Sequence, residues 1–196
     1  MKIRTVALTL GMIGALGLLA GCELKGGVEQ GRCIAYDKEG KTLTIVVESL
    51  ASPAYNAQSA SQTYKLPVED RDMGPEPRVG GLLALDVKNK TALVFDKNAK
   101  AIRTISMPEA PTVKEKVDPA TVKGKTFPDT STAGMVTVYS PSRKTLTTFK
   151  VPDDAADLDA YAWTYGDEMR VAFLNASKDQ ALRILNTTKT SIYKRK

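Results

Sequence analysis

Short runs in which apolar and polar residues alternate follow one another along most of the chain, and almost none repeats with the period of a helix. Alternation with a period of two is typical of strands that bury one face. Two clear examples have their apolar positions at Leu43, Ile45 and Val47, and at Leu83, Leu85 and Val87. The pattern therefore predicts an all-β protein of short strands joined by turns.

Similar runs continue to the C-terminal part of the chain, at residues 93–95, 101–105, 135–139, 145–151, 169–174 and 181–185. The stretch 107–122 differs, because it contains three prolines among charged residues and has no apolar period. Such a composition is typical of a linker. We expect this stretch to join two β-rich parts.

The two parts repeat a series of local features in the same order. TYKLP at 63–67 matches TFKVP at 148–152. Gly80 precedes a predicted hairpin over 83–95, and Gly166 precedes one over 169–184. Self-similarity of this kind is typical of duplicated supersecondary units. We predict a tandem of two small, related, half-open β-barrel modules of the OB or SH3-like type, at 28–106 and 123–196, joined by the Pro-rich linker 107–122.

The N-terminal segment has the features of an export signal. Lys2 and Arg4 precede an uncharged, mostly apolar stretch that ends in Leu19-Ala20-Gly21-Cys22. This ending resembles the lipobox of bacterial lipoproteins. The resemblance implies that the signal peptide 1–21 is removed, that the Cys22 thiol is acylated, and that residues 22–27 form a short lipidated tether to the bilayer. The alternative is an ordinary secretory signal cleaved nearby.

A lipobox implies the bacterial cell envelope, with the folded part facing the periplasm. Glu23 follows the cysteine where some inner-membrane lipoproteins have Asp, so the outer membrane is favoured over the inner. The formal charge of the whole chain is +6, from 28 Lys and Arg against 22 Asp and Glu. Removal of Lys2 and Arg4 with the signal leaves about +4, which is too small to indicate a nucleic-acid partner.

The chain contains no histidine and two cysteines, Cys22 and Cys33. This composition excludes Ser-His-Asp and Cys-His catalytic sites, His-ligated metals and Cys₄ clusters. We therefore expect no catalytic residue, no metal and no cofactor. Cys33 alternates with strand-forming residues and is interpreted as a small buried hydrophobe, with a redox role as the alternative.

Aromatic residues supply the candidate binding groups. Tyr161, Trp163 and Tyr165 are clustered before Gly166, while Tyr55 and Tyr64 lie in or beside a long polar loop. Aromatics on the face of an OB-like barrel can stack on sugars or bases. The alternative is that the same side chains belong to the core, where Trp and Tyr are usually well buried.

An acidic cluster at 153–159 has two interpretations. It contains four aspartates but lacks the ligand order of an EF-hand. Asp153 or Asp154 is instead expected to cap a short helix that continues to Tyr161.

Five short motifs carry a family resemblance along the mature chain: VEQGR at 28–32, TYKLP at 63–67, MGPEP at 73–77, GDEMR at 166–170 and NTTKT at 186–190. Together they resemble an uncharacterised lipoprotein family of sulfate-reducing bacteria, classed as a domain of unknown function. The resemblance implies an exported, lipidated, β-rich protein, and it carries no activity or ligand to this chain.

The sequence thus favours a non-enzymatic membrane-anchored lipoprotein that binds another envelope protein or a glycan through its β modules. One alternative is a carboxylate-based hydrolase acting on envelope material, because carboxylate or lysine chemistry needs neither histidine nor thiol. The other is a structural spacer in a membrane complex.

Overall fold

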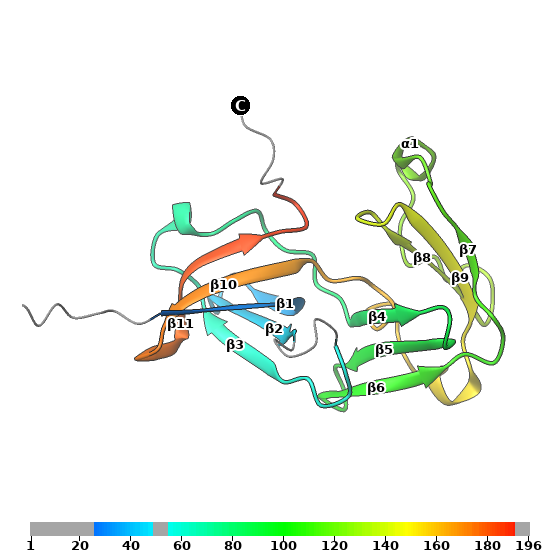
Figure 1. Cartoon of the computed structure of the whole chain (residues 1–196), viewed down its shortest axis with the longest axis horizontal. Coiled ribbons are helices and arrows are strands. Elements are labelled where there is room, and N and C mark those ends of the chain that lie inside the picture. The colour runs from blue at the N-terminus through cyan, green and yellow to red at the C-terminus, as the bar shows by residue number, and fades with distance from the viewer. Residues whose placement is uncertain (1–25, 49–54, 191–196) are drawn as a thin grey trace, which may run out of the picture.

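The protein was analysed as a computed structural model that describes residues 26–48 and 55–190. This part of the chain is all-β, as predicted, and its elements appear in Figure 1. The strands are β1 (Gly26–Asp37), β2 (Thr42–Val47), β3 (Ser61–Lys65), β4 (Leu82–Asp86), β5 (Thr91–Asp96), β6 (Ala101–Ser106), β7 (Thr112–Lys114), β8 (Met135–Ser140), β9 (Thr145–Lys150), β10 (Glu168–Leu174) and β11 (Ser177–Asn186). Helical structure is limited to α1 (Pro119–Val122) and 3₁₀ turns at Asp70–Asp72 and Asp153–Ala155.

Five strands form a closed barrel in the order β1-β10-β11-β3-β2. Most neighbours are antiparallel, and the barrel closes through one parallel pair, Gln180 with Lys65. The Gln180 side chain strengthens this seam by donating from Nε2 to the carbonyl of Leu66 at 2.9 Å. Closure leaves few unpaired strand edges in this body.

Apolar side chains fill the interior of the barrel. Its buried residues are Cys33, Leu43, Ile45, Tyr64, Met169, Val171, Phe173, Ala181 and Ile184. The rings of Tyr64 and Phe173 stack with their centroids 6.0 Å apart. Because side chains fill the interior of so small a barrel, a ligand would have to bind outside it.

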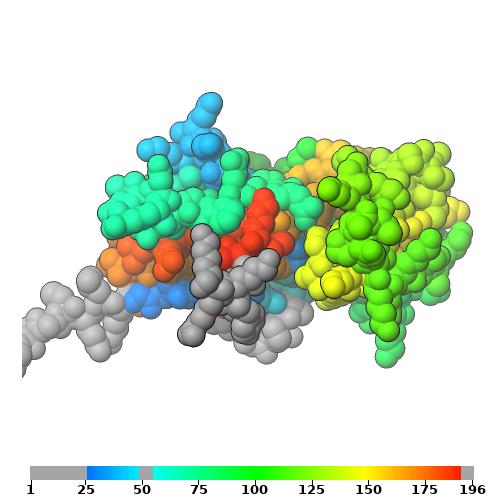
Figure 2. Space-filling model, turned by 90° about the horizontal axis from the view of Figure 1, so that it is seen from above, coloured from blue at the N-terminus to red at the C-terminus, as the bar shows by residue number. Residues whose placement is uncertain are grey.

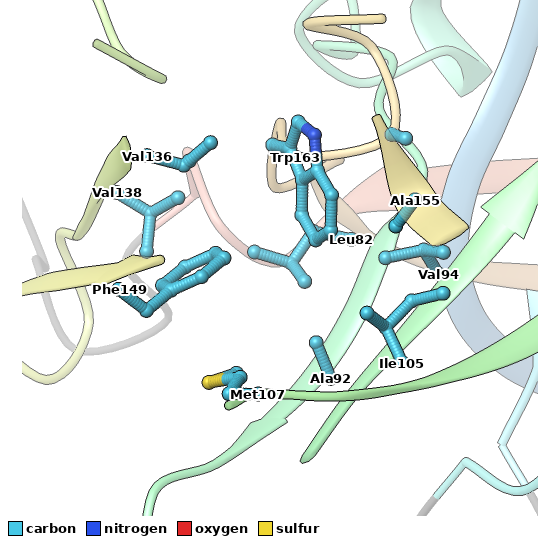
Figure 3. Packing of buried hydrophobic residues seen from close by; sticks show 11 residues of the cluster. Leu82, Ala92, Val94, Ile105, Met107, Val136, Val138, Phe149, Ala155 and Trp163 are labelled. Carbon is cyan, nitrogen blue, oxygen red and sulfur yellow. The ribbon is translucent and has the colours of Figure 1, made fainter. Parts of the chain in front are cut away.

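The other strands form two three-stranded sheets, β4-β5-β6 and β7-β9-β8, which share a second core. Figure 3 shows Trp163 with valines of β8 on one side, Ala155 on the other and Leu82 of β4 beneath its ring. Phe149 meets the Trp163 ring edge-on, with centroids 5.4 Å apart. The two sheets are therefore held together by a single aromatic-centred cluster.

Alternation along β5 and β6 lets one sheet serve two cores. Ala92, Val94 and Ile105 face the Trp163 core, whereas Leu93, Phe95 and Ile102 pack against a third cluster that includes Ile34, Val46 and Tyr55 on the barrel side. The sheet β4-β5-β6 thus lies between the barrel and the sheet β7-β9-β8, and these parts lie side by side in Figure 1.

The strand pairing differs from the predicted tandem of separate barrels. The barrel takes β1 to β3 from residues before 66 and β10 and β11 from residues after 167, so it combines strands of both predicted modules. The repeat is visible in the order of elements, since β3 and β9 each precede a 3₁₀ turn and then a hairpin. The two hairpins are exchanged: β10-β11 completes the barrel of the first part, and β4-β5 packs on β8-β9 of the second.

The exchange requires two chain segments to cross at close range. Gly80 and Gly166, the two repeat-related glycines, lie at this crossing. A Cβ atom on Gly80 would lie 2.2 Å from the Thr164 carbonyl oxygen, and one on Gly166 would lie 2.1 Å from that of Cys33. The crossing therefore has room for hydrogen only, which explains glycine at both repeat positions.

Several local predictions are corrected by the structure. Within 107–122, predicted as a linker, Met107 is buried in the Trp163 core, and the same stretch contains β7 and α1. Residues 26 and 27, assigned to the tether, belong to β1. Leu83 and Leu85 were expected on one face, but a register shift between Leu82 and Ala84 turns Leu83 towards the barrel and Leu85 towards the Trp163 core.

The predicted helix after the acidic cluster is also wrong. The helical turn ends at Ala155, and neither Asp153 nor Asp154 caps it, since Pro152 occupies the N-cap position without a side-chain hydrogen bond. Asp159 instead accepts a hydrogen bond from the Tyr161 backbone N–H at 3.1 Å. The aspartates therefore stabilise turns rather than a helix.

Candidate functional site

A cavity of about 600 Å³ opens where the barrel meets the two sheets. Its volume falls in the range typical of small-ligand sites. Its walls come from β1 and β10 of the barrel, from β4, from the β8-β9 turn, and from the segment that follows β11. In Figure 2 the barrel strands, in blue and orange, and the teal and red segments that follow β3 and β11 lie beside the yellow and green residues of the other body. The cavity exists because the hairpin exchange brings these segments together.

Arg32 of β1 lines one wall of the cavity, and its guanidinium contacts four other residues. Its Nη2 pairs with Glu168 Oε1 at 2.5 Å, and its Nη1 donates to the Gly166 carbonyl at 2.9 Å. The guanidinium also stacks near the rings of Tyr55 and Tyr165, 5.7 and 5.3 Å from their centroids. Because Arg32 is only 17% exposed, these contacts fix it as a rigid, partly desolvated cation.

The Arg32 Nε atom is buried and has no hydrogen-bond partner among the described residues. An unsatisfied donor of this kind is uncommon in folded proteins and costs free energy unless a bound molecule or water accepts from it.

Glu168 is the counterion of Arg32. Burial raises the pKa of this carboxyl above its usual value, and the charge of Arg32 partly offsets the rise. The Tyr55 hydroxyl donates to both carboxylate oxygens, at 3.0 and 3.1 Å. Burial and the neighbouring Glu168 charge raise the pKa of Tyr55, so Tyr55 stays a hydrogen-bond donor at neutral pH.

A polar network supports the cavity from behind. Asp167 is 1% exposed, and its Oδ2 accepts from the Arg78 backbone N–H and from Asn186 Nδ2, both at 2.9 Å. Lys189 Nζ lies 3.4 Å from the same oxygen, and Arg78 Nε lies 3.8 Å from Oδ1. These bonds tie the segment before β4 to the end of β11, so both walls are positioned together.

A second cavity, of about 550 Å³, shares Arg78 and Pro141 with the first. The rings of Phe127 and Tyr139 contribute to its lining, with their centroids 5.8 Å apart. The two cavities are therefore adjacent, with Arg78 and Pro141 between them, and together we call them the junction groove.

Cations outnumber carboxylates in the junction groove. Its charged lining residues are Arg32, Arg78, Arg143, Lys123 and Lys125, against Glu48 and Glu168. Within the described ranges, ion pairs engage Arg32 with Glu168 and Arg78 with the buried Asp167. Arg143, Lys123 and Lys125 are exposed at the groove and are free to meet a ligand.

The five aromatic residues predicted as binding candidates lie in different parts of the fold. Tyr55 and Tyr165 lie together in the junction groove, on either side of Arg32. Tyr64 lies inside the barrel and Trp163 between the sheets, so both belong to the core. Tyr161 donates from its hydroxyl to the Ile34 carbonyl at 2.8 Å and joins the barrel to the neighbouring loop.

Cys33 is buried in the barrel as interpreted, and burial raises the pKa of its thiol to about 12. Cys22, the predicted lipidation site, lies outside the described residues. The described part of the chain has no group of three or more acidic or thiol side chains suited to a metal ion. It also contains no helix long and apolar enough to span a bilayer.

Sequence reasoning missed Arg32, Glu168 and Arg143 as site residues. A signal was available for Arg32, because a charged residue between Gly31 and Cys33 interrupts a strand whose neighbours are buried. Glu168 and Arg143 carry no comparable signal, since the fold alone brings the start of β10 near the β8-β9 turn.

Neither a search of curated proteins nor a search of solved structures finds a match to this chain. A family model described as a domain of unknown function (DUF4881) matches residues 25–195. The match covers the barrel, both sheets and every residue of the junction groove. The chain belongs to this family.

Proposed function

We propose that the protein is a non-enzymatic, lipid-anchored envelope protein that binds another envelope protein or a glycan in the junction groove. The observation that carries this proposal is the Arg32 wall, where a guanidinium is fixed between two tyrosine rings beside an open cavity of about 600 Å³. Rigid, partly desolvated groups of this kind favour binding because little entropy is lost when a ligand arrives.

The anchor in this proposal is the acylated Cys22, with the folded part facing the periplasm and the outer membrane favoured. Three residues separate Cys22 from Gly26, the first residue of β1, which makes four Cα–Cα steps. Even a fully extended chain of that length spans only about 14 Å. The barrel would therefore stay close to the headgroups, and the junction groove, midway along β1, would face material near the membrane.

Lipidation is tested by growing cells that express wild-type protein or Cys22→Ala with a fatty-acid probe. The wild type is expected to incorporate the probe and to fractionate with membranes, and the variant is expected to do neither. Lipid incorporation into Cys22→Ala protein would contradict the anchor.

Binding in the groove is tested by site-specific photocrosslinking in native membranes. A photoreactive residue at Ser142, which is exposed in the β8-β9 turn and lines the groove, should yield a covalent adduct with protein or saccharide. The matched control is the same residue at Lys178, exposed near the start of β11 and outside the groove lining. No adduct at Ser142, or the same adducts at both positions, would refute the proposed function.

The second candidate function, a carboxylate-based hydrolase, is favoured by one observation. Glu48 and Glu168 line the same cavity, and burial raises the pKa of Glu168 as a general acid requires. Against it, Glu168 is paired with Arg32 at 2.5 Å and accepts from Tyr55 on both oxygens, so its lone pairs are already engaged. Release of soluble fragments from purified cell-wall material by wild-type protein, lost in Glu168→Gln and Glu48→Gln, would favour the hydrolase.

A further inference from the structure

The charge and lining of the junction groove specify a class of ligand. We infer that the groove binds an acidic glycan, an oligosaccharide that carries carboxylate groups, with Arg143 and Lys123 as the residues that recognise its charges. This inference rests on the proposed function and narrows its partner to one chemical class.

Charge complementarity is the first argument. The groove is lined by five cationic side chains and two carboxylates, and one of those carboxylates, Glu168, is neutralised by Arg32. Arginine matches a carboxylate with two parallel hydrogen bonds, and lysine supplies a compact positive charge. Arg143 in the β8-β9 turn and Lys123 after α1 line different cavities of the groove, so they suit an extended ligand with repeated negative charges.

The uncharged polar lining of the first cavity is the second argument, and it favours a glycan. Uncharged hydroxyl and amide side chains contribute to the wall of the first cavity beside its charged ones: Gln30, Ser140, Ser142, Thr187 and Thr188. Aliphatic lining comes from the β4 residues at 83–85 and Pro141 in the first cavity, and from Pro119, Ala120 and Val122 in the second. Donors and acceptors in this number suit the hydroxyl groups of sugars.

Aromatic rings lie where sugar faces can pack. Tyr165 contributes to the first cavity, and Phe127 and Tyr139 contribute to the second. Arg32, fixed on the wall beside the Tyr165 ring, adds a partly exposed cation. The groove thus combines cations, hydrogen-bonding groups and ring faces along one path.

The test is calorimetric titration of the full mature chain, without its lipid, with three defined probes: trigalacturonate as an acidic glycan, maltotriose as a neutral one, and tetraglutamate as an acidic peptide. Trigalacturonate is expected to bind most tightly, and its affinity should fall as salt rises. The double variant Arg143→Gln/Lys123→Gln should bind about 100-fold more weakly, since each lost charge-assisted contact costs about tenfold. Lys178→Gln, exposed outside the groove lining, should bind like wild type.

Each contrary outcome overturns the inference. Equal binding of maltotriose would remove the role of charge, and tighter binding of tetraglutamate would assign the groove to an acidic protein segment. Absence of trigalacturonate binding, or an equal loss in Lys178→Gln, would also refute it. If these probes fail while the Ser142 adduct persists, the proposed function stands and only the ligand class is wrong.

Discussion

Gly166→Ala tests the crossing on which the whole arrangement depends. The new Cβ would lie 2.1 Å from the Cys33 carbonyl oxygen and 3.1 Å from the Gly80 carbonyl oxygen. Both neighbours are main-chain atoms, so no side-chain rotation relieves the contact. Main-chain segments would have to separate by about 1.3 Å to reach the lower limit of ordinary van der Waals contact at 3.4 Å.

That displacement affects the hydrogen bonds of the crossing. Cys33 accepts from the Gly80 N–H at 3.1 Å and donates to the Asp167 carbonyl at 2.9 Å. Overpacking costs about 1–3 kcal/mol, and each weakened hydrogen bond adds about 1 kcal/mol. The free energy of unfolding should therefore fall by about 3–5 kcal/mol, or Tm by about 6–20 °C for a chain of this size.

The assay is equilibrium unfolding in urea, followed by the fluorescence of Trp163, the only tryptophan, and by far-UV circular dichroism. Gly134→Ala is the matched control, because its φ of +69° is unfavourable for alanine but no atom lies within 4 Å of the new Cβ. Its cost should be about 1–2 kcal/mol from backbone conformation alone. A Gly166→Ala protein as stable as the Gly134→Ala protein would refute the reasoning on the crossing.

Two further predictions follow from the same structure. The fragment 123–196 should fail to melt cooperatively on its own, because β10 lacks β1, β11 lacks β3, and the Trp163 core lacks the sheet β4-β5-β6; a sharp transition at the Tm of the full chain would contradict the exchange. Cys33, with a thiol pKa raised to about 12, should react with a maleimide at pH 8 only when the protein is unfolded, and fast reaction of the native protein would contradict its burial. The unfolded thiol ionises near its ordinary pKa of 9.0, so below that pH the contribution of Cys33 to stability is intact. From there to about pH 12 that contribution is lost as pH rises. The slope is about 1.4 kcal/mol per pH unit for this one proton, and Cys33→Ala should remove that part of the alkaline loss.

The sequence predicted which residues form strands better than it predicted which strands pair, and the reason is physical. Alternation along β2 or β9 identifies which face is buried, but any apolar face of similar length can cover it. The repeated order of strand, 3₁₀ turn and hairpin is present in both halves, yet local pattern is the same whether a hairpin packs on its own half or on the other. Pairing between residues more than a hundred positions apart, such as Gly31 with Met169, therefore had no local signal.

The candidate site shows the same limit on a smaller scale. Tyr55 and Tyr165 were recognised as aromatic candidates because loops near turns often carry binding residues. Their common partner Arg32 lies on a strand more than a hundred residues before Tyr165, and its counterion Glu168 begins another strand. Only the closed barrel brings these charges to 2.5 Å of each other.

The exchange and the groove are physically one feature, and this links ligand binding to stability. The walls of the groove belong to both bodies, and the crossing at Gly80 and Gly166 lies at its base, since Gly166 itself lines the first cavity. A ligand that contacts β1, β4 and the β8-β9 turn at once binds only when the bodies are correctly placed, so it stabilises the folded chain by mass action. A crossing loosened by Gly166→Ala should therefore weaken trigalacturonate binding as well as lower Tm, although Gly166 offers no charge to the ligand. Gly134→Ala, away from the groove lining, should leave that affinity unchanged.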